Sequence, residues 1–133
     1  MTTVPTGVVN HFALTVTDKD RARDFYTEVL NFKFLMEFGP KYLLSNDQLI
    51  LALNESPDPS QSIPDDRFNE NRVGLDHISL AVSSREDLER ASQEFDRRGI
   101  PHGEIEDLGD LGILVMAFRD PDNIQLELTA PKS

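Results

Sequence analysis

Cysteine is absent from this sequence, and several other features are scarce. Without cysteine the chain has neither a disulfide framework nor a zinc–thiolate site, so we expect a cytoplasmic protein. Its apolar runs stay short of the roughly 18 residues that a membrane span requires. The N-terminal residues also lack the charged and apolar segments of a secretory signal, so neither an anchor nor a signal peptide is expected.

Positive charge is scarce as well. The 13 Lys and Arg residues are outnumbered by 24 Asp and Glu residues, which gives a formal net charge of −11 at pH 7. Because such a field repels polyanions, we expect neither nucleic acid nor an anionic membrane surface as a partner. A phosphate-binding glycine loop, a nucleophile elbow and a heptad pattern are also missing. The charge and motifs therefore exclude several function classes without identifying a substrate.

The chain does contain an internal repeat. Residues 11–16 read His-Phe-Ala-Leu-Thr-Val, and residues 77–82 read His-Ile-Ser-Leu-Ala-Val, 66 positions later. Each copy continues into a helical pattern and then into short alternating strands, which predicts two strand–helix–strand–strand–strand modules. We expect one domain over residues 1–133, with modules at 8–54 and 74–130 joined by a proline-rich linker at 55–73.

Periodicity and turn residues place the elements. The first module is predicted to contain a strand at 8–17, a helix capped by Thr17 or Asp18, and strands at 32–38, 42–45 and 48–53. The second is predicted to contain a strand at 75–83, a helix with a capping box of Ser83 and Glu86 that ends at Gly99 and Pro101, and strands near 103–106, 111–118 and 123–130. The apolar stripes of the helices comprise Ala22, Phe25, Tyr26, Val29 and Leu30 in the first and Leu88, Ala91 and Phe95 in the second.

Alternation in the strands separates two faces of each sheet. Bulky aliphatic residues share the face that packs on a helix, whereas His11, His77 and Glu127 share the opposite face with small or polar residues. Two of only three histidines thus occupy equivalent places in the repeat. Two imidazoles and one carboxylate form the facial triad that suits Fe(II) and leaves up to three coordination positions open. The alternative is that the histidines are structural and the glutamate is merely solvated.

The residues around these positions resemble the vicinal oxygen chelate superfamily, which includes glyoxalases, extradiol dioxygenases, epimerases and bleomycin- and fosfomycin-resistance proteins. The resemblance rests on residues 11–18, 25–26 and 29–32 in the first copy and on 75–82 and 118–128 in the second. It implies an α+β fold in which two tandem βαβββ modules form an open, U-shaped mixed sheet with a helix on the outer face of each module. It also implies a homodimer, and by position it makes His11, His77 and Glu127 metal ligands.

Ala52 departs from the pattern of that superfamily. Alignment of the repeats places it opposite Glu127, where many glyoxalases and epimerases have a fourth ligand, and alanine cannot coordinate. A glyoxalase I-like lyase is therefore disfavoured, because its second carboxylate also transfers protons. Three ligands are typical of extradiol dioxygenases and fosfomycin thiol transferases. However, residues 111–119 lack the Tyr and His of extradiol enzymes, and the acidic stretch at 104–110 disfavours a phosphonate dianion.

We therefore expect a metal-dependent enzyme for a small substrate with adjacent oxygens, with dioxygenase-like ring cleavage favoured over glyoxalase-like isomerisation. The expected ion is Fe(II) or Mn(II), with Ni(II), Co(II) and Zn(II) as alternatives. Glu127 and His102 are the candidate catalytic residues, although His102 also fits a surface residue. The competing hypothesis is a metal-free or metal-assisted drug- or metabolite-binding protein of the bleomycin- or fosfomycin-resistance type. Either one chain or two could build the site.

Overall fold

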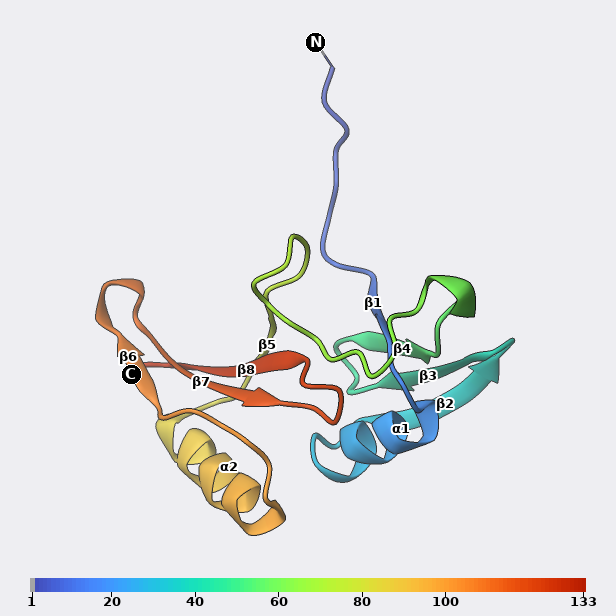
Figure 1. Cartoon of the computed structure of the whole chain (residues 1–133). Helices are drawn as coiled ribbons and strands as arrows, with labels where there is room; N and C mark the ends of the chain where they lie inside the picture. The colour runs from blue at the N-terminus through green and yellow to red at the C-terminus, as the bar shows by residue number, and fades with distance from the viewer. Residues whose placement is uncertain (1) are drawn as a thin grey trace. The chain divides into compact units, whose positions relative to one another are not determined.

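The fold consists of two compact units, which divide between Pro64 and Asp65. The structure is a computed structural model that describes residues 2–133. Each unit contains one four-stranded mixed sheet and one α-helix (Figure 1). The predicted α+β fold of two strand–helix–strand–strand–strand modules is confirmed. The finer division into modules at 8–54 and 74–130 with a linker at 55–73 stays a prediction.

The first unit places its strands in the order β1-β4-β3-β2. The outer strand β1 pairs in parallel with β4, and the other neighbours are antiparallel. Two parallel strands must be joined by a long crossover connection, and the connection from β1 to β4 starts with the helix that follows β1. The elements are β1 (His11–Thr15), α1 (Lys19–Glu28), β2 (Lys33–Phe38), β3 (Lys41–Ser45) and β4 (Ile50–Asn54), followed by a short 3-10 turn at Pro59–Gln61.

The second unit repeats this topology with the strand order β5-β8-β7-β6. Again the first strand of the unit pairs in parallel with the last, and the remaining pairs are antiparallel. The sequence repeat is therefore a repeat of the fold. The elements are β5 (Ile78–Ala81), α2 (Arg85–Arg98), β6 (Glu106–Leu108), β7 (Ile113–Arg119) and β8 (Gln125–Pro131), with a short 3-10 turn at Gly109–Leu111.

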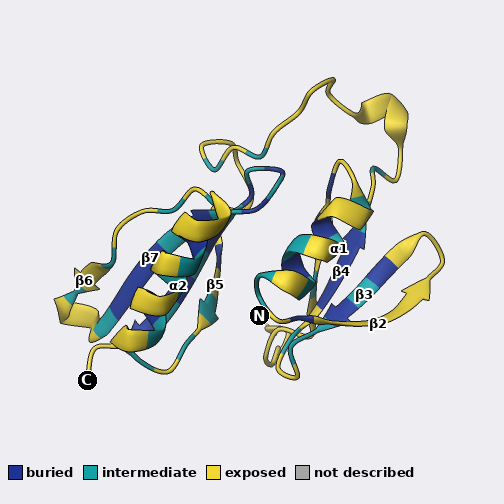
Figure 2. Ribbon diagram, turned by 90° about the horizontal axis from the view of Figure 1, so that it is seen from below, coloured by how far each residue is buried: buried dark blue, intermediate teal, exposed yellow. Residues whose placement is uncertain are grey.

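Each unit has its core between the helix and one face of the sheet, as the buried central strands in Figure 2 show. Within the second unit the rings of Phe95 on α2 and Phe118 on β7 stack with centroids 4.6 Å apart. Side chains of this size contribute about 1.5–3 kcal/mol each when fully buried. The largest fully buried side chains are those of Tyr26, Leu44 and Leu53 in the first unit and Leu88, Leu114, Met116, Phe118 and Leu126 in the second.

The helix ends agree with the sequence at two of three predicted signals. Asp18 caps α1, its carboxylate accepting from two main-chain N–H groups of the first turn, and Gly99 ends α2 with a φ of 70°. The predicted capping box of Ser83 and Glu86 is wrong by one residue. Ser84 is the N-cap, and Asp87 accepts from the Ser83 N–H. Among residues 2–133, neither α-helix is long and apolar enough to cross a bilayer.

The strands at the two predicted histidine ligands are shorter than predicted. The ladder of β1 with β4 runs from the His11–Ile50 pair to the Thr15–Asn54 pair, because β4 begins only at Ile50. The predicted strand at 75–83 shrinks to β5, so His77 lies one residue ahead of it. The predicted strand at 103–106 is displaced as well. After an isolated bridge of His102 with Phe118, regular pairing resumes only in β6.

Candidate metal site

His77 and Glu127 are brought together on the second unit. His77 lies just ahead of β5, and Glu127 is the third residue of β8, beside Ser79 in the parallel ladder. Nε2 of His77 is 3.6 Å from Oε1 of Glu127. Nδ1 of His77 lies 2.7 Å from the carboxylate oxygen Oδ1 of Asp76. Since a carboxylate can only accept, Nδ1 donates, and Nε2 is left to face Glu127.

Hydroxyl groups orient the carboxylate of Glu127. Thr129, two residues further along the same face of β8, donates to Oε1 of Glu127 at 3.3 Å. The hydroxyl of Ser79 is in turn hydrogen-bonded to that of Thr129. The side chain of Glu127 is 19 % exposed. This carboxylate is therefore only partly solvated and is held in a fixed orientation on a face whose neighbours are small.

The His77–Glu127 pair fits the geometry of two ligands on one ion. Donors about 2.1 Å from a divalent ion lie roughly 3.0–3.6 Å apart at coordination angles of about 90–120°, and the observed separation is 3.6 Å. Neither unit by itself gathers three His, Asp or Glu side chains as a metal-binding group within residues 2–133. The second unit alone thus supplies two donors, and an ion would need a further ligand or water.

His11, the third predicted ligand, belongs to the first unit. It is the first residue of β1 and is exposed. Its Nδ1 is 2.7 Å from the side-chain oxygen of Asn10. Because that amide oxygen is an acceptor, Nδ1 donates here too, and Nε2 is the nitrogen left for a ligand. The assignment of His11, His77 and Glu127 as one metal triad stays a prediction.

Ala52 occupies the place in the first unit that Glu127 occupies in the second. The parallel ladders pair Ala13 with Ala52 and Ser79 with Glu127. Since Ala13 and Ser79 are themselves repeat partners, 66 positions apart, the correspondence drawn from the sequence agrees with the register. The first unit therefore offers no fourth oxygen ligand at this position, and Ala52 is buried among its neighbours.

A polar network that the sequence analysis missed supports Asp76. The side-chain nitrogen of Gln125 donates to Oδ1 of Asp76 at 3.0 Å and to its main-chain oxygen at 3.1 Å. Arg119 donates to the side-chain oxygen of Gln125 at 3.3 Å. Arg119 also forms a bidentate pair with Glu70, with N–O distances of 2.8 and 3.0 Å. The network thus runs without a break from Glu70 to His77.

The same network fixes the segment that precedes β5. The two hydrogen bonds from Arg119 are the main cause that lowers the pKa of Glu70 to about 2. Phe68 donates its N–H to the main-chain oxygen of Asp122 at 3.0 Å, and the amide of Asn123 donates back to the oxygen of Phe68 at 3.0 Å. These contacts tie residues 68–70 to the turn between β7 and β8.

His102, predicted as a catalytic residue, lies on the helix side of the second sheet. Its Nε2 is 2.6 Å from the Asp96 carboxylate on α2, and its Nδ1 is 2.7 Å from the main-chain oxygen of Gly103. The hydrogen bond with Asp96 is the main cause that raises the pKa of His102. Both ring nitrogens are engaged, and Glu127 faces the other side of the sheet. A catalytic role for His102 stays a prediction.

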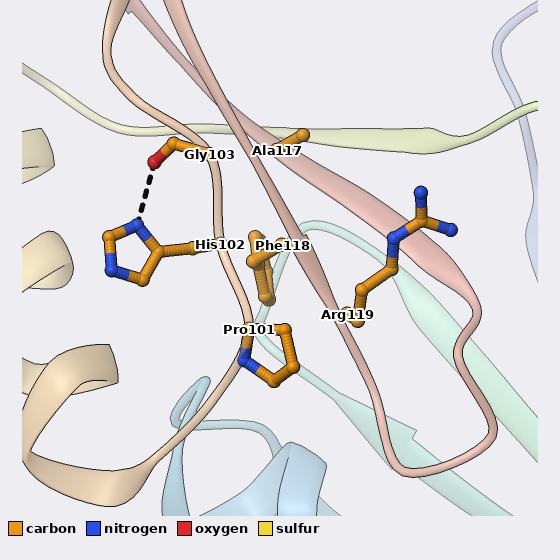
Figure 3. Close-up of a pocket in the computed structure, with 6 residues that line it drawn as sticks. All are labelled: Pro101, His102, Gly103, Ala117, Phe118 and Arg119. Carbon is orange, nitrogen blue, oxygen red and sulfur yellow. Dashed lines mark hydrogen bonds between the residues drawn. The ribbon is translucent and has the colours of Figure 1, made fainter.

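A shallow pocket of about 290 Å³ lies beside His102. Figure 3 shows that the imidazole of His102, on the segment after α2, and the guanidinium of Arg119, at the end of β7, point in opposite directions. The lining does not include His77 or Glu127. The lining residues are Pro101, His102, Gly103, Ala117, Phe118 and Arg119.

Two proteins of similar sequence match nearly the whole chain. Uncharacterized protein YwkD of Bacillus subtilis (strain 168) is 29% identical over 127 residues, which cover 90% of this chain and 94% of that protein. The glyoxylase/bleomycin resistance protein/dioxygenase domain from Frankia sp. EAN1pec is 30% identical with a TM-score of 0.79, over 96% of this chain and 93% of that one.

Two more distant solved structures share the fold. Lactoylglutathione lyase from Agrobacterium tumefaciens is 21% identical with a TM-score of 0.72, over 97% of each chain. The fosfomycin resistance protein FosX from Listeria monocytogenes, solved in complex with Mn(II) and sulfate, is 16% identical with a TM-score of 0.74, over 96% of this chain and 92% of that one. Residues 8–128 match the sequence profile of one family, so the chain belongs to the glyoxalase/bleomycin resistance protein/dioxygenase superfamily.

Proposed function

We propose that this protein is a metal-dependent enzyme of the vicinal oxygen chelate type. The observation that carries the proposal is the His77–Glu127 pair, whose Nε2 and Oε1 atoms are 3.6 Å apart on the face of β8 that turns away from α2. His11 completes the ligand set in this proposal. The expected ion is Fe(II) or Mn(II), and Mn(II) is the ion bound by the FosX structure that shares the fold.

The residues around the pair define the chemistry that the site can support. A divalent ion bound there supplies Lewis acidity to a substrate with two adjacent oxygens. Glu127 is the group that can accept or return a proton beside the substrate, and Thr129 holds its carboxylate in place. Ala52 adds no oxygen ligand, so coordination positions stay open for a chelating substrate. This favours ring cleavage of a catechol-like substrate over a glyoxalase-type isomerisation.

A homodimer and a cytoplasmic location are parts of the same proposal. The edge strand β2 exposes the apolar side chains of Phe34, Leu35, Met36 and Phe38, all between 44% and 65% exposed. Exposed apolar edges of this kind are usually covered by another chain. A second copy of this protein is the partner that we expect to cover β2.

The test is metal uptake by untagged protein that has been purified without chelator and then stripped of metal. Calorimetric titration with Mn(II) should show about one ion bound per chain, and His77→Ala should abolish uptake while circular dichroism stays unchanged. His102→Gln is the matched control, because it removes an imidazole of the same unit whose nitrogens bind Asp96 and Gly103 instead. That variant should take up Mn(II) as the parent does.

Two results would contradict the proposal. Equal Mn(II) uptake by the parent and His77→Ala would remove His77 from the ligand set. Absence of uptake with every divalent ion from Mn(II) to Zn(II) would favour the metal-free binding protein. For a protein that does bind metal, oxygen consumption with a catechol, set against isomerisation of a hemithioacetal, separates the two reaction classes.

A further inference from the structure

The same hydrogen bond occurs at both predicted histidine ligands. In the first unit, the side-chain oxygen of Asn10 is 2.7 Å from Nδ1 of His11. In the second unit, the side-chain oxygen of Asp76 is 2.7 Å from Nδ1 of His77. Asn10 and Asp76 are 66 positions apart, which is the spacing of the histidines themselves. The residue before each histidine thus makes the same contact in both copies of the fold.

This bond determines which nitrogen of each ring carries the proton. A carboxylate or amide oxygen can only accept a hydrogen bond, so Nδ1 of the neighbouring imidazole must be the donor. The neutral ring then has a lone pair on Nε2, and only a nitrogen with a free lone pair can bind a metal ion. Metal-binding histidines are commonly oriented by an acceptor on the second nitrogen in this way.

The two acceptors differ in charge and support. Asp76 is an anion whose Oδ1 also accepts from Gln125, and Gln125 is held by Arg119. Asn10 is neutral and exposed. A charged acceptor forms a stronger hydrogen bond with the imidazole that donates to it than a neutral acceptor does. The acceptor at His77 is therefore charged and held by further hydrogen bonds, whereas the acceptor at His11 is neutral and exposed.

We propose that Asp76 and Asn10 are positioning residues that hold His77 and His11 with Nε2 free for a metal ion, with Asp76 the stronger of the two. The inference rests on the proposed function for its metal, but the tautomer itself does not require one. The carboxylate of Asp76, which accepts from Nδ1 of His77, is itself held in place by Gln125. Gln125 is held by Arg119, and Arg119 is paired with Glu70.

The first experiment reads the tautomer in metal-free protein. Nitrogen-15 NMR of the imidazole rings, at about pH 9 where ordinary imidazoles are neutral, distinguishes Nδ1–H from Nε2–H. We expect Nδ1–H at His77 in the parent and a shift toward Nε2–H in Asp76→Ala. Asp76→Asn retains an acceptor oxygen and should keep the parent tautomer, so it separates the hydrogen bond from the charge.

The second experiment measures Co(II) affinity of the same proteins by calorimetry. Loss of an outer partner of a ligating histidine weakens metal binding by roughly 10–100-fold, and we expect Asp76→Ala in that range. Asp76→Asn and Asn10→Ala should lose about tenfold or less. The control is Asp107→Ala, which removes an exposed carboxylate of the same unit that pairs with Lys132 and no histidine. Its affinity should equal that of the parent.

The outcomes separate this inference from the proposed function. Nε2–H at His77 in the parent, or equal Co(II) affinity in the parent and Asp76→Ala, overturns the positioning role. If His77 is Nδ1–H and changes tautomer in Asp76→Ala but no metal binds to any of the proteins, the proposed function is overturned, while Asp76 is supported as the residue that sets the tautomer. An equal loss in Asp107→Ala would show a general charge effect and also overturn the inference.

Discussion

The two units share one topology but differ in what they place on the face away from the helix. In the second unit that face carries Ser79, Glu127 and Thr129, joined by hydrogen bonds. The strand registers put Ala13, Ala52 and Asn54 at the corresponding places of the first unit. The two copies therefore share the strand pairing and the histidine, whereas the carboxylate and its supporting hydroxyls occur in the second copy only. The frame is symmetric and the candidate chemistry is not.

The outer edges of the two sheets differ as well. The edge strand β2 has six residues, all exposed, and four of them are large and apolar. In the second unit the edge strand β6 has three residues, two of which are acidic. Short, charged edges resist pairing with other chains, whereas long apolar edges invite it. The first unit is therefore the one expected to meet a partner, and the second is the one expected to hold most of the ligands.

The largest effect should come from substitutions in the two cores, which are equivalent because the two units share one topology. Phe118 pairs with Leu126 on β8, as Leu44 pairs with Leu51 on β4, and both side chains are almost fully buried. Phe118→Ala should lower the free energy of unfolding by about 3–5 kcal/mol and Leu44→Ala by about 2–5 kcal/mol. Differential scanning calorimetry measures both losses and shows whether they fall on one transition or two.

The control for this pair is Val73→Ala, because Val73 is fully exposed and precedes β5. Its free energy of unfolding should stay within about 0.5 kcal/mol of the parent value. A loss below about 1 kcal/mol in Leu44→Ala would show that the first unit lacks a packed counterpart of the Phe118 core.

A smaller change should follow from giving the first unit the missing carboxylate. Ala52→Glu places a carboxylate opposite Ala13, as Glu127 lies opposite Ser79. We expect divalent ions to bind about tenfold more tightly, and any activity that needs bidentate chelation to fall, because one open position is lost. Calorimetric titration with Mn(II) measures the first effect and turnover the second.

Gln48→Glu is the matched control, since it adds the same charge to an exposed turn of the first unit. It should leave Mn(II) affinity unchanged. Unchanged affinity in Ala52→Glu as well would mean that this strand does not reach the ion. Tighter binding without loss of turnover would instead mean that the substrate binds the ion through a single oxygen.

The smallest effect should come from His102 and Asp96, a pair that belongs to the second unit only. Hydrogen bonding to Asp96 raises the pKa of His102, so the protonated ring stabilises the fold. That stabilisation is complete below the ordinary imidazole pKa of about 6.5 and disappears as pH rises through the raised value. Asp96→Asn should therefore cost up to about 1 kcal/mol at about pH 5.5 and almost nothing near pH 9.

Urea unfolding at the two pH values measures this difference. Asp24→Asn on α1 is the control, because it disturbs an ion pair with Arg23 and no histidine. The loss in that variant should not depend on pH over this range. An equal loss at both pH values in Asp96→Asn would contradict an effect that acts through protonation of His102.

Much of the fold could be predicted because it depends on local periodicity. The order of strands and helices, the cap at Asp18 and the end of α2 at Gly99 are encoded within a few residues of each site. The capping box was misplaced because Ser83-Ser84 and Glu86-Asp87 allow two registers with the same spacing. The choice of Ser84 depends on where α2 packs its buried Leu88 and Phe95, and local sequence does not determine this.

The candidate site could be predicted only at positions that the alignment of the two repeat copies identifies. The places of His77, Glu127 and Ala52 follow from alternation and from alignment of the two copies. Asn10 and Asp76 obey the same 66-residue spacing and could have been found by extending that alignment by one residue. The Arg119–Glu70 pair could not, because its members are 49 residues apart and meet only after β7 and the segment before β5 have packed together.

The ion pair between Glu70 and Arg119 determines where the second unit can be separated from the rest of the chain. The compact unit begins at Asp65, nine residues ahead of the second predicted module at position 74. A fragment cut at the start of that module would keep every strand and the helix but would leave Arg119 without its carboxylate partner. The second unit is therefore more than a strand–helix–strand–strand–strand module. It includes the leading segment 65–73, and a fragment that lacks this segment should be less stable than one that begins at Asp65.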